Sequence, residues 1–167
     1  RIAQLCEKLC EKGYSVLVTA LTNRALMEVA DKRKKTLVKD CKVYKTNLTT
    51  DEAREVSGIQ CSEKVSAKPG KLVLSTFYIS SGAVVNGYES PLFDYVIVDE
   101  ASQAFFAMLA AAHMLGIKNL WVGDIYQMPP IVLMSDDRIK RQGYEPIVNG
   151  LDTLTSSMRF PNYQLSD

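Results

Sequence analysis

The N-terminal part of the chain combines helical periodicity with short, continuous apolar runs. Apolar side chains recur at the spacing of one helix face at Ile2, Leu5, Cys6, Leu9 and Cys10. Gly13 follows as a helix stop, and the run 16–18 is apolar at every position, which is typical of a strand covered on both faces. The chain is therefore predicted to open with a helix and then a buried strand.

Capping residues indicate where two further helices begin. Thr22 or Asn23 is a suitable N-cap for a helix over the apolar-periodic positions that follow. Thr49 and Glu52 have the spacing of a capping box, which predicts a short helix that Gly58 closes. Helices are therefore expected to follow the first strand and to recur near residue 50.

The middle of the chain has weaker signals. We interpret residues 59–70 as a polar loop and residues 71–76 as a short strand. The stretch that contains Gly82 and Gly87 is predicted to be irregular, because glycines interrupt any regular period there.

A third strand ends in two adjacent carboxylates. The run 95–98 has no polar alternation, and Asp99 and Glu100 follow it directly. Open parallel sheets place their ligands at the carboxyl ends of their strands. We therefore expect these two carboxylates to take part in chemistry.

The same order of strand and acid occurs once more downstream. A helix is predicted over about 102–115 with Gly116 as its stop, and the strand 120–122 leads to Asp124. Only one crossover separates the two strands, so Asp99 and Asp124 are expected at the same edge of the sheet. The alternation of strands and helices predicts a layered α/β fold with a mostly parallel sheet.

Composition is that of one globular domain. The 167 residues are 47% hydrophobic and 23% charged, with a net charge of +1, which disfavours disordered and fibrous classes. Neither a signal peptide nor a bilayer-length apolar run occurs, so a cytoplasmic or nuclear protein that is not secreted is expected. The four cysteines lack zinc-site spacing and are expected to be free buried thiols, and His113 is not expected to be a ligand.

One stretch is locally basic, with cations at Lys32, Arg33, Lys34, Lys35, Lys39, Lys42 and Lys45. Two interpretations stay open. The cations lie either on a solvated helix end, where the helix dipole favours them, or in a phosphate-binding patch.

The acidic strand ends suit phosphoryl transfer. That reaction needs an acid to hold Mg²⁺ and a second group to orient or deprotonate the attacking water, and Asp99 and Glu100 fit these roles. Gln127 follows Asp124 closely enough to hydrogen-bond a γ-phosphate or its attacking water, in a loop stiffened by the prolines at 129–130.

Five segments of the chain resemble motifs of superfamily one helicases. Asp99-Glu100-Ala101-Ser102-Gln103 looks like the Walker B segment, and residues 123–130 look like the third motif, whose usual form is Gly-Asp-x-x-Gln-Leu-Pro-Pro. Residues 18–25 are similar to motif Ia, residues 75–76 to a further strand-contacting motif, and residues 157–161 to the segment that supplies an arginine to the γ-phosphate. Five segments in the right order are more specific than any one of them.

The resemblance implies the first of two RecA-like motor lobes, which is a three-layer α/β fold of the P-loop NTPase type with helices on both faces of a mostly parallel sheet. It implies ATP and Mg²⁺ as cofactors. Asp99 would bind Mg²⁺, commonly through water, Glu100 would activate water, Gln127 and Arg159 would contact the γ-phosphate, and Asp124 would position the third motif.

The resemblance also implies two partners. One is single-stranded DNA or RNA, contacted by Thr19, Thr22, Asn23, Ser75 and Thr76. The other is the second RecA-like lobe, and no membrane is involved.

The chain departs from the family at Met128, which replaces the usual leucine, and at Met158, where many relatives have an aromatic residue. The larger departure is that no Gly-x-x-x-x-Gly-Lys-Ser/Thr phosphate loop (Walker A) occurs in its 167 residues. In the family that loop precedes the helix leading to motif Ia, and this chain starts inside such a helix. We therefore expect a truncated fragment that is inactive alone, with a partial ATPase lobe at 1–150 and a segment leading toward the second lobe at 151–167. The alternative is a non-catalytic nucleic-acid- or protein-binding module with a degenerate motor-lobe fold.

Overall fold

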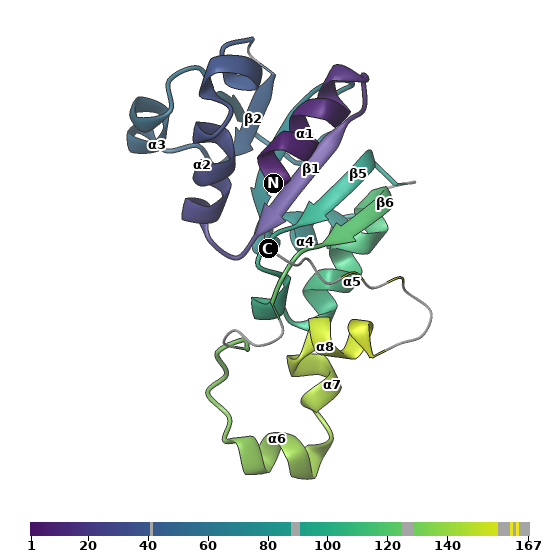
Figure 1. Ribbon diagram of the computed structural model, residues 1–167. Helices are drawn as coiled ribbons and strands as arrows, with labels where there is room; N and C mark the ends of the chain where they lie inside the picture. Colours follow the sequence, from purple (N-terminus) through teal and green to yellow (C-terminus); the bar gives the residue numbers. More distant parts are fainter. Residues whose placement is uncertain (41, 88–90, 125–128, 157–160, 162, 164–167) are drawn as a thin grey trace.

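A six-stranded parallel sheet forms the centre of the molecule (Figure 1). The computed structural model describes residues 1–40, 42–87, 91–124, 129–156, 161 and 163. The strands are β1 (Val16–Ala20), β2 (Val43–Thr46), β3 (Gln60–Ser62), β4 (Leu72–Thr76), β5 (Phe93–Val98) and β6 (Gly116–Trp121). They are ordered β3-β2-β4-β1-β5-β6, and every neighbouring pair is parallel, so all six carboxyl ends lie at one edge.

Helices cover both faces of the sheet. The helices α1 (Ile2–Glu11) and α2 (Asn23–Asp31) cover one face, whereas α4 (Phe77–Val85) and α5 (Phe106–Leu115) cover the other (Figure 1). Alternate strand residues therefore enter different core clusters: Val16 and Val18 pack with α1 and α2, and Leu17 packs with α4 and α5. This arrangement confirms the predicted three-layer α/β fold with helices on both faces of a parallel sheet.

The predicted caps are present. The side chain of Thr22 accepts a hydrogen bond from the amide of Ala25 at 3.2 Å, which opens α2. The short helix α3 (Thr50–Glu55) begins with the predicted capping box, in which Thr49 and Glu52 each accept from the other's amide. These local signals were sufficient to place both helix starts.

Two regions differ from their predicted structure. Part of the predicted loop 59–70 forms β3, a three-residue strand that pairs with β2 at one end of the sheet. The stretch predicted to be irregular forms α4, which is apolar on most sides and packs on α5, β4 and β1. Gly82 does not interrupt this helix, because tertiary packing outweighs the low helix propensity of glycine.

The helix predicted over 102–115 begins later than predicted, whereas its end at Leu115 is confirmed. A 3₁₀ turn, η2 (Ala101–Gln103), comes first, and α5 begins only at Phe106. Gly116 ends α5 and is itself the first residue of β6, where a Cβ atom would lie 2.6 Å from Val96 Cγ2. The chain therefore passes from helix to strand without a loop.

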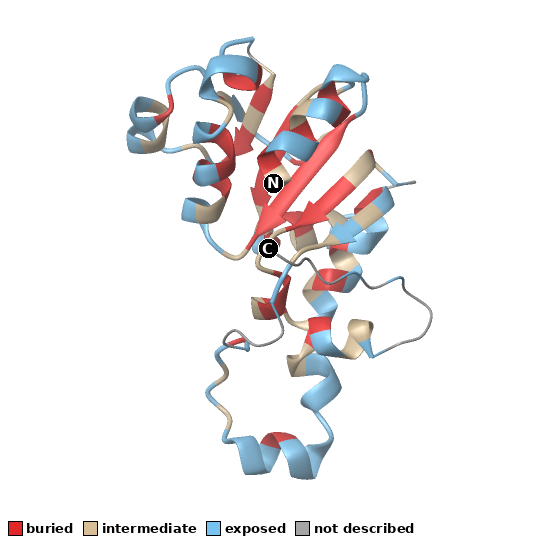
Figure 2. Ribbon diagram, viewed as in Figure 1, coloured by how far each residue is buried: buried red, intermediate tan, exposed pale blue. Residues whose placement is uncertain are grey.

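The C-terminal helices are α6 (Asp136–Gln142), α7 (Glu145–Val148) and α8 (Gly150–Thr155). Figure 2 shows that α6 is largely exposed, whereas the buried residues concentrate on the central strands. Leu151 of α8 is buried in the core cluster of α4 and α5, so the division expected at residue 150 falls within a helix of that core. No helix in the described ranges is long and apolar enough to cross a membrane.

The burial of the cysteines and of the basic stretch agrees only in part with the prediction. Cys6 and Cys10 are free and buried, and burial raises the pKa of each thiol to about 12, whereas Cys61 is free but exposed. Cys41 lies outside the described residues. Lys45 is fully buried in β2, so it is neither a solvated helix-end cation nor part of an exposed phosphate patch.

Candidate functional site

The two acidic strand ends lie side by side, as the sequence predicted. Val98 at the end of β5 pairs with Trp121 at the end of β6. Beyond these residues, the amide of Val122 donates to the carbonyl of Val98 at 2.8 Å, and the amide of Ala101 donates to the carbonyl of Val122 at 2.9 Å. The turn that carries Glu100 is therefore hydrogen-bonded to the segment that leads to Asp124.

The backbone of this turn has an uncommon conformation. Glu100 has a φ of 54°, in the left-handed region that residues other than glycine seldom adopt. Gly123 faces the turn so closely that a Cβ atom would lie 2.7 Å from the amide nitrogen of Ser102 and 2.8 Å from Leu151 Cδ2. Only glycine fits at position 123, because the two backbones are in direct contact there.

A cavity of about 780 Å³ opens at this edge of the sheet. Its lining includes Asp99, Glu100, Ser102, Gly123 and Asp124 from the strand ends, together with residues of α1 and α2. The N-cap residue Arg1 and the first two residues of α1, Ile2 and Ala3, also line it, so the N-terminus of this ten-residue helix lies at the cavity. Unpaired amides at a helix N-terminus favour an anion.

Burial makes both carboxylates at the end of β5 more basic than usual. The pKa of Asp99 is raised by desolvation, although the amide of Glu100, which donates to Asp99 Oδ1 at 3.0 Å, and the charge of Lys32 oppose this effect. The pKa of Glu100 is raised by desolvation and by repulsion from Asp99 and Glu28. A carboxylate with a raised pKa is better able to accept a proton near neutral pH.

Two buried polar atoms of this turn have no hydrogen-bond partner within the described residues. They are Oε2 of Glu100 and Oγ of Ser102. Buried polar atoms are nearly always paired in folded proteins, so unpaired atoms beside a cavity point to a site that binds a further group.

The residues predicted to contact nucleic acid are divided between the surface and the interior. Thr22 and Asn23 are exposed at the start of α2, and Thr76 is half-buried. Thr19 and Ser75 are fully buried; the hydroxyl of Thr19 pairs with that of Ser80 at 2.9 Å. Of the five residues predicted to contact the single strand, only Thr22, Asn23 and Thr76 therefore have exposed surface.

Two predicted catalytic residues, Gln127 and Arg159, lie outside the described residues. Asp124 is exposed and lines the cavity together with Asp99 and Glu100. The structure thus brings three of the predicted acidic side chains to one cavity.

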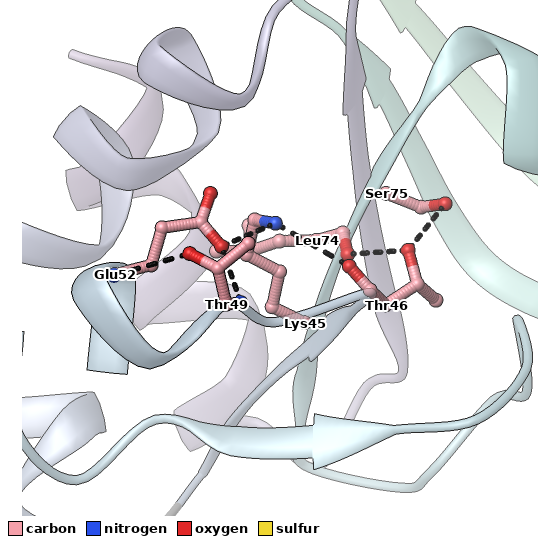
Figure 3. Close-up of polar contacts among 6 residues, drawn as sticks. All are labelled: Lys45, Thr46, Thr49, Glu52, Leu74 and Ser75. Atoms are coloured by element: carbon pink, nitrogen blue, oxygen red, sulfur yellow. Dashed lines mark hydrogen bonds and ion pairs between the residues drawn. The ribbon is translucent and has the colours of Figure 1, made fainter.

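A second buried polar group lies at the same edge and was not predicted; we call it the Lys45 cluster (Lys45, Thr46, Glu52 and Ser75; Figure 3). Lys45 Nζ donates to Glu52 Oε2 at 3.0 Å and to the carbonyl of Thr46 at 3.3 Å. The hydroxyl of Thr46 donates to that of Ser75 at 3.0 Å. The capping box located Glu52, but no local signal indicated that Lys45 would be its partner.

The side chains at the cavity fit a magnesium ion only if water and a bound phosphate complete its coordination shell. Among the described residues, no group of three His, Cys, Asp or Glu side chains could hold a metal ion. Mg²⁺ is commonly bound through one or two carboxylates, with water and phosphate oxygens completing the shell. The carboxylate of Asp99, with unpaired Oε2 of Glu100 beside it, is compatible with that mode of binding.

Comparison with known proteins gives one family and several relatives. The model of the "AAA domain" family matches residues 27–135. The chain is 26% identical over 136 residues to the DNA replication ATP-dependent helicase/nuclease DNA2 of Saccharomyces cerevisiae, covering 78% of this chain and 9% of the relative. It is 29% identical over 145 residues to DNA2 of Xenopus laevis, covering 82% of this chain and 14% of the relative.

A third relative is an uncharacterized ATP-dependent helicase, MJ0104, of Methanocaldococcus jannaschii. It is 24% identical over 96 residues, which cover 58% of this chain and 14% of the relative. The chain thus spans between 9% and 14% of the length of these curated relatives.

Proposed function

Because this chain belongs to the AAA domain family and is related to superfamily one helicases, we propose that its cavity is the ATP-hydrolysing site of a helicase or translocase that moves along single-stranded nucleic acid. The observation that carries this proposal is the meeting of the α1 N-terminus with Asp99, Glu100 and Asp124 around one cavity. The helix end suits the phosphates of a nucleotide, and the carboxylates suit a cation and a proton.

Each side chain is assigned a separate role. Asp99 holds Mg²⁺ through water, and the ion, when bound, neutralises charge on the phosphates. Glu100 accepts a proton from the attacking water, for which its raised pKa is suited. The water oxygen forms a bond to the γ-phosphorus, the bond from that phosphorus to the β,γ-bridging oxygen breaks, and ADP leaves.

The remaining roles concern coupling to nucleic acid. Asp124 positions the third motif, and Gln127 and Arg159 contact the γ-phosphate. The single strand contacts Thr22, Asn23 and Thr76 at the same edge, where Thr22 also lines the cavity. A second RecA-like lobe completes the site in this proposal.

The experiment that tests the proposal is replacement of Glu100 by glutamine in the full-length protein that carries this domain. Glu100→Gln should lower ATP turnover stimulated by single-stranded DNA or RNA by at least about 100-fold, while the affinity for ATP changes little. The matched control is Glu63→Gln, because Glu63 is exposed and does not line the cavity.

The outcome also separates the two candidate functions. Wild-type turnover in Glu100→Gln would remove Glu100 from the mechanism. A wild-type protein that binds single strands but neither binds nor hydrolyses ATP would instead support the non-catalytic binding module.

A further inference from the structure

Ser102 lies in the 3₁₀ turn η2, two residues after Glu100, and it lines the same cavity. Its side chain is only 9% exposed, and its hydroxyl has no hydrogen-bond partner within the described part of the chain. A buried hydroxyl without a partner destabilises the folded state, because its hydration is lost without compensation. Ser102 therefore lowers the stability of the free protein.

Other buried hydroxyls at the same edge do not have this defect. Thr19 and Ser80 are paired with each other at 2.9 Å, and Ser80 also donates to the carbonyl of Thr76 at 2.9 Å. Thr46 and Ser75 are paired at 3.0 Å. The fold thus satisfies neighbouring hydroxyls of similar burial, and Ser102 is an exception that packing alone does not explain.

The backbone of Ser102 is held in place by its neighbours. A Cβ atom added at Gly123 would lie 2.7 Å from the amide nitrogen of Ser102, so no side chain fits there. The preceding residue, Ala101, is hydrogen-bonded to Val122, and Leu151 of α8 packs beside Gly123. A serine hydroxyl moves between staggered rotamers by rotation about one bond. The hydroxyl can therefore change partners while its backbone stays fixed.

The two unpaired atoms of this turn have complementary chemistry. Glu100 Oε2, when ionised, only accepts hydrogen bonds, and Ser102 Oγ both donates and accepts them. A water molecule with both hydrogens directed at two acceptors presents its lone pairs on the other side. That is the orientation which an in-line attack on phosphorus requires.

On the basis of the function proposed above, we propose that Ser102 is a positioning residue for the water that attacks the γ-phosphate. The water donates one hydrogen to the Ser102 hydroxyl and the other, which is transferred as the proton, to Glu100. The water oxygen bonds to the γ-phosphorus as the bond to the leaving ADP oxygen breaks. Ser102 itself exchanges no proton and forms no bond to the substrate.

The test compares Ser102→Ala with wild type in the full-length protein, with ATP turnover measured at saturating single-stranded nucleic acid. We expect kcat to fall about 10-fold and KM for ATP to stay within about twofold, because the lost contact orients water and does not bind the nucleotide. The melting temperature of Ser102→Ala should equal or exceed that of wild type, because alanine removes an unsatisfied hydroxyl.

The matched control is Ser80→Ala, which removes a buried hydroxyl that is paired. This variant should have a lower melting temperature, because Thr19 loses its partner, and an unchanged kcat. Ser102 and Ser80 are therefore expected to show opposite patterns of stability and turnover.

The possible failures are distinguishable when Glu100→Gln is measured alongside. Loss of turnover in Glu100→Gln with wild-type kcat in Ser102→Ala overturns the role of Ser102 and leaves the proposed function intact. A raised KM with unchanged kcat makes Ser102 a nucleotide-binding residue, and a lowered melting temperature makes it structural; either result overturns the proposal. Absence of ATP hydrolysis by wild type overturns both proposals together.

Discussion

Two buried polar groups at the carboxyl edge of one sheet differ in whether their atoms are paired. In the Lys45 cluster, the ammonium, the carboxylate and both hydroxyls have hydrogen-bond partners at 2.9–3.3 Å. In the turn after β5, Glu100 Oε2 and Ser102 Oγ have none among the described residues. Both groups lie at the carboxyl edge of the same sheet, so the difference does not come from their place in the topology.

The direction of each carboxylate's pKa shift agrees with this difference. Burial alone would raise the pKa of Glu52, but hydrogen bonds from Thr49 and Lys45 and the charge of Lys45 outweigh it and lower that pKa. Burial raises the pKa of Glu100, and repulsion from Asp99 adds to the effect. A satisfied buried charge stabilises the fold, whereas an unsatisfied one beside a cavity is suited to exchange protons with a substrate.

The largest expected effect comes from breaking the Lys45 cluster. Glu52→Ala should lower the free energy of unfolding by about 3 kcal/mol, because it leaves the fully buried Lys45 ammonium without its partner and removes a capping box. Chemical denaturation measures this value. Arg54→Ala is the control, since its ion pair with Asp51 is exposed and should contribute less than about 1 kcal/mol. Equal losses in the two variants would contradict a structural role for the cluster.

A smaller effect is expected from acid. The folded-state pKa of Glu52 is lowered, so its contribution to stability is fully present above its unfolded value, near 4.5, and is lost as the pH falls through the lower folded value. Asp94, whose pKa is lowered by hydrogen bonds from the amide and hydroxyl of Ser15, acts in the same direction. Melting temperatures measured from pH 6 to pH 3 should fall, and less steeply in Glu52→Gln. An equally steep fall in that variant would show that Glu52 makes no stabilising ion pair with Lys45 in solution.

The smallest effect on stability should have the opposite sign. Glu100→Gln replaces a partly desolvated charge beside Asp99 by a neutral amide, so the melting temperature should stay unchanged or rise slightly, even though turnover is lost. Differential scanning calorimetry of wild type and variant measures this shift. A clear decrease would place Glu100 with Glu52 as a structural carboxylate.

Much of the fold could be predicted because its signals are local. The caps at Thr22 and Thr49 were correctly identified, since a cap and its partner amide are three residues apart in the chain. The continuous apolar runs located β1, β4 and β5, because strands buried on both faces have no polar alternation. The helix α4 and the strand β3 were missed, because packing on distant elements, and not their own sequence, stabilises them.

The sequence by itself determined which residues end the strands: with a parallel sheet expected, the acids after β5 and β6 had to meet at one edge. Only the tertiary structure decided which polar atoms there are paired. Lys45 finds Glu52 across a turn, Thr19 finds Ser80 across 61 positions, and Ser102 finds no partner among the described residues. Pairing depends on distances that are set only when the chain folds, whether the partners are 7 positions apart, as Lys45 and Glu52 are, or 61, as Thr19 and Ser80 are. No residue spacing encodes those distances before the chain folds.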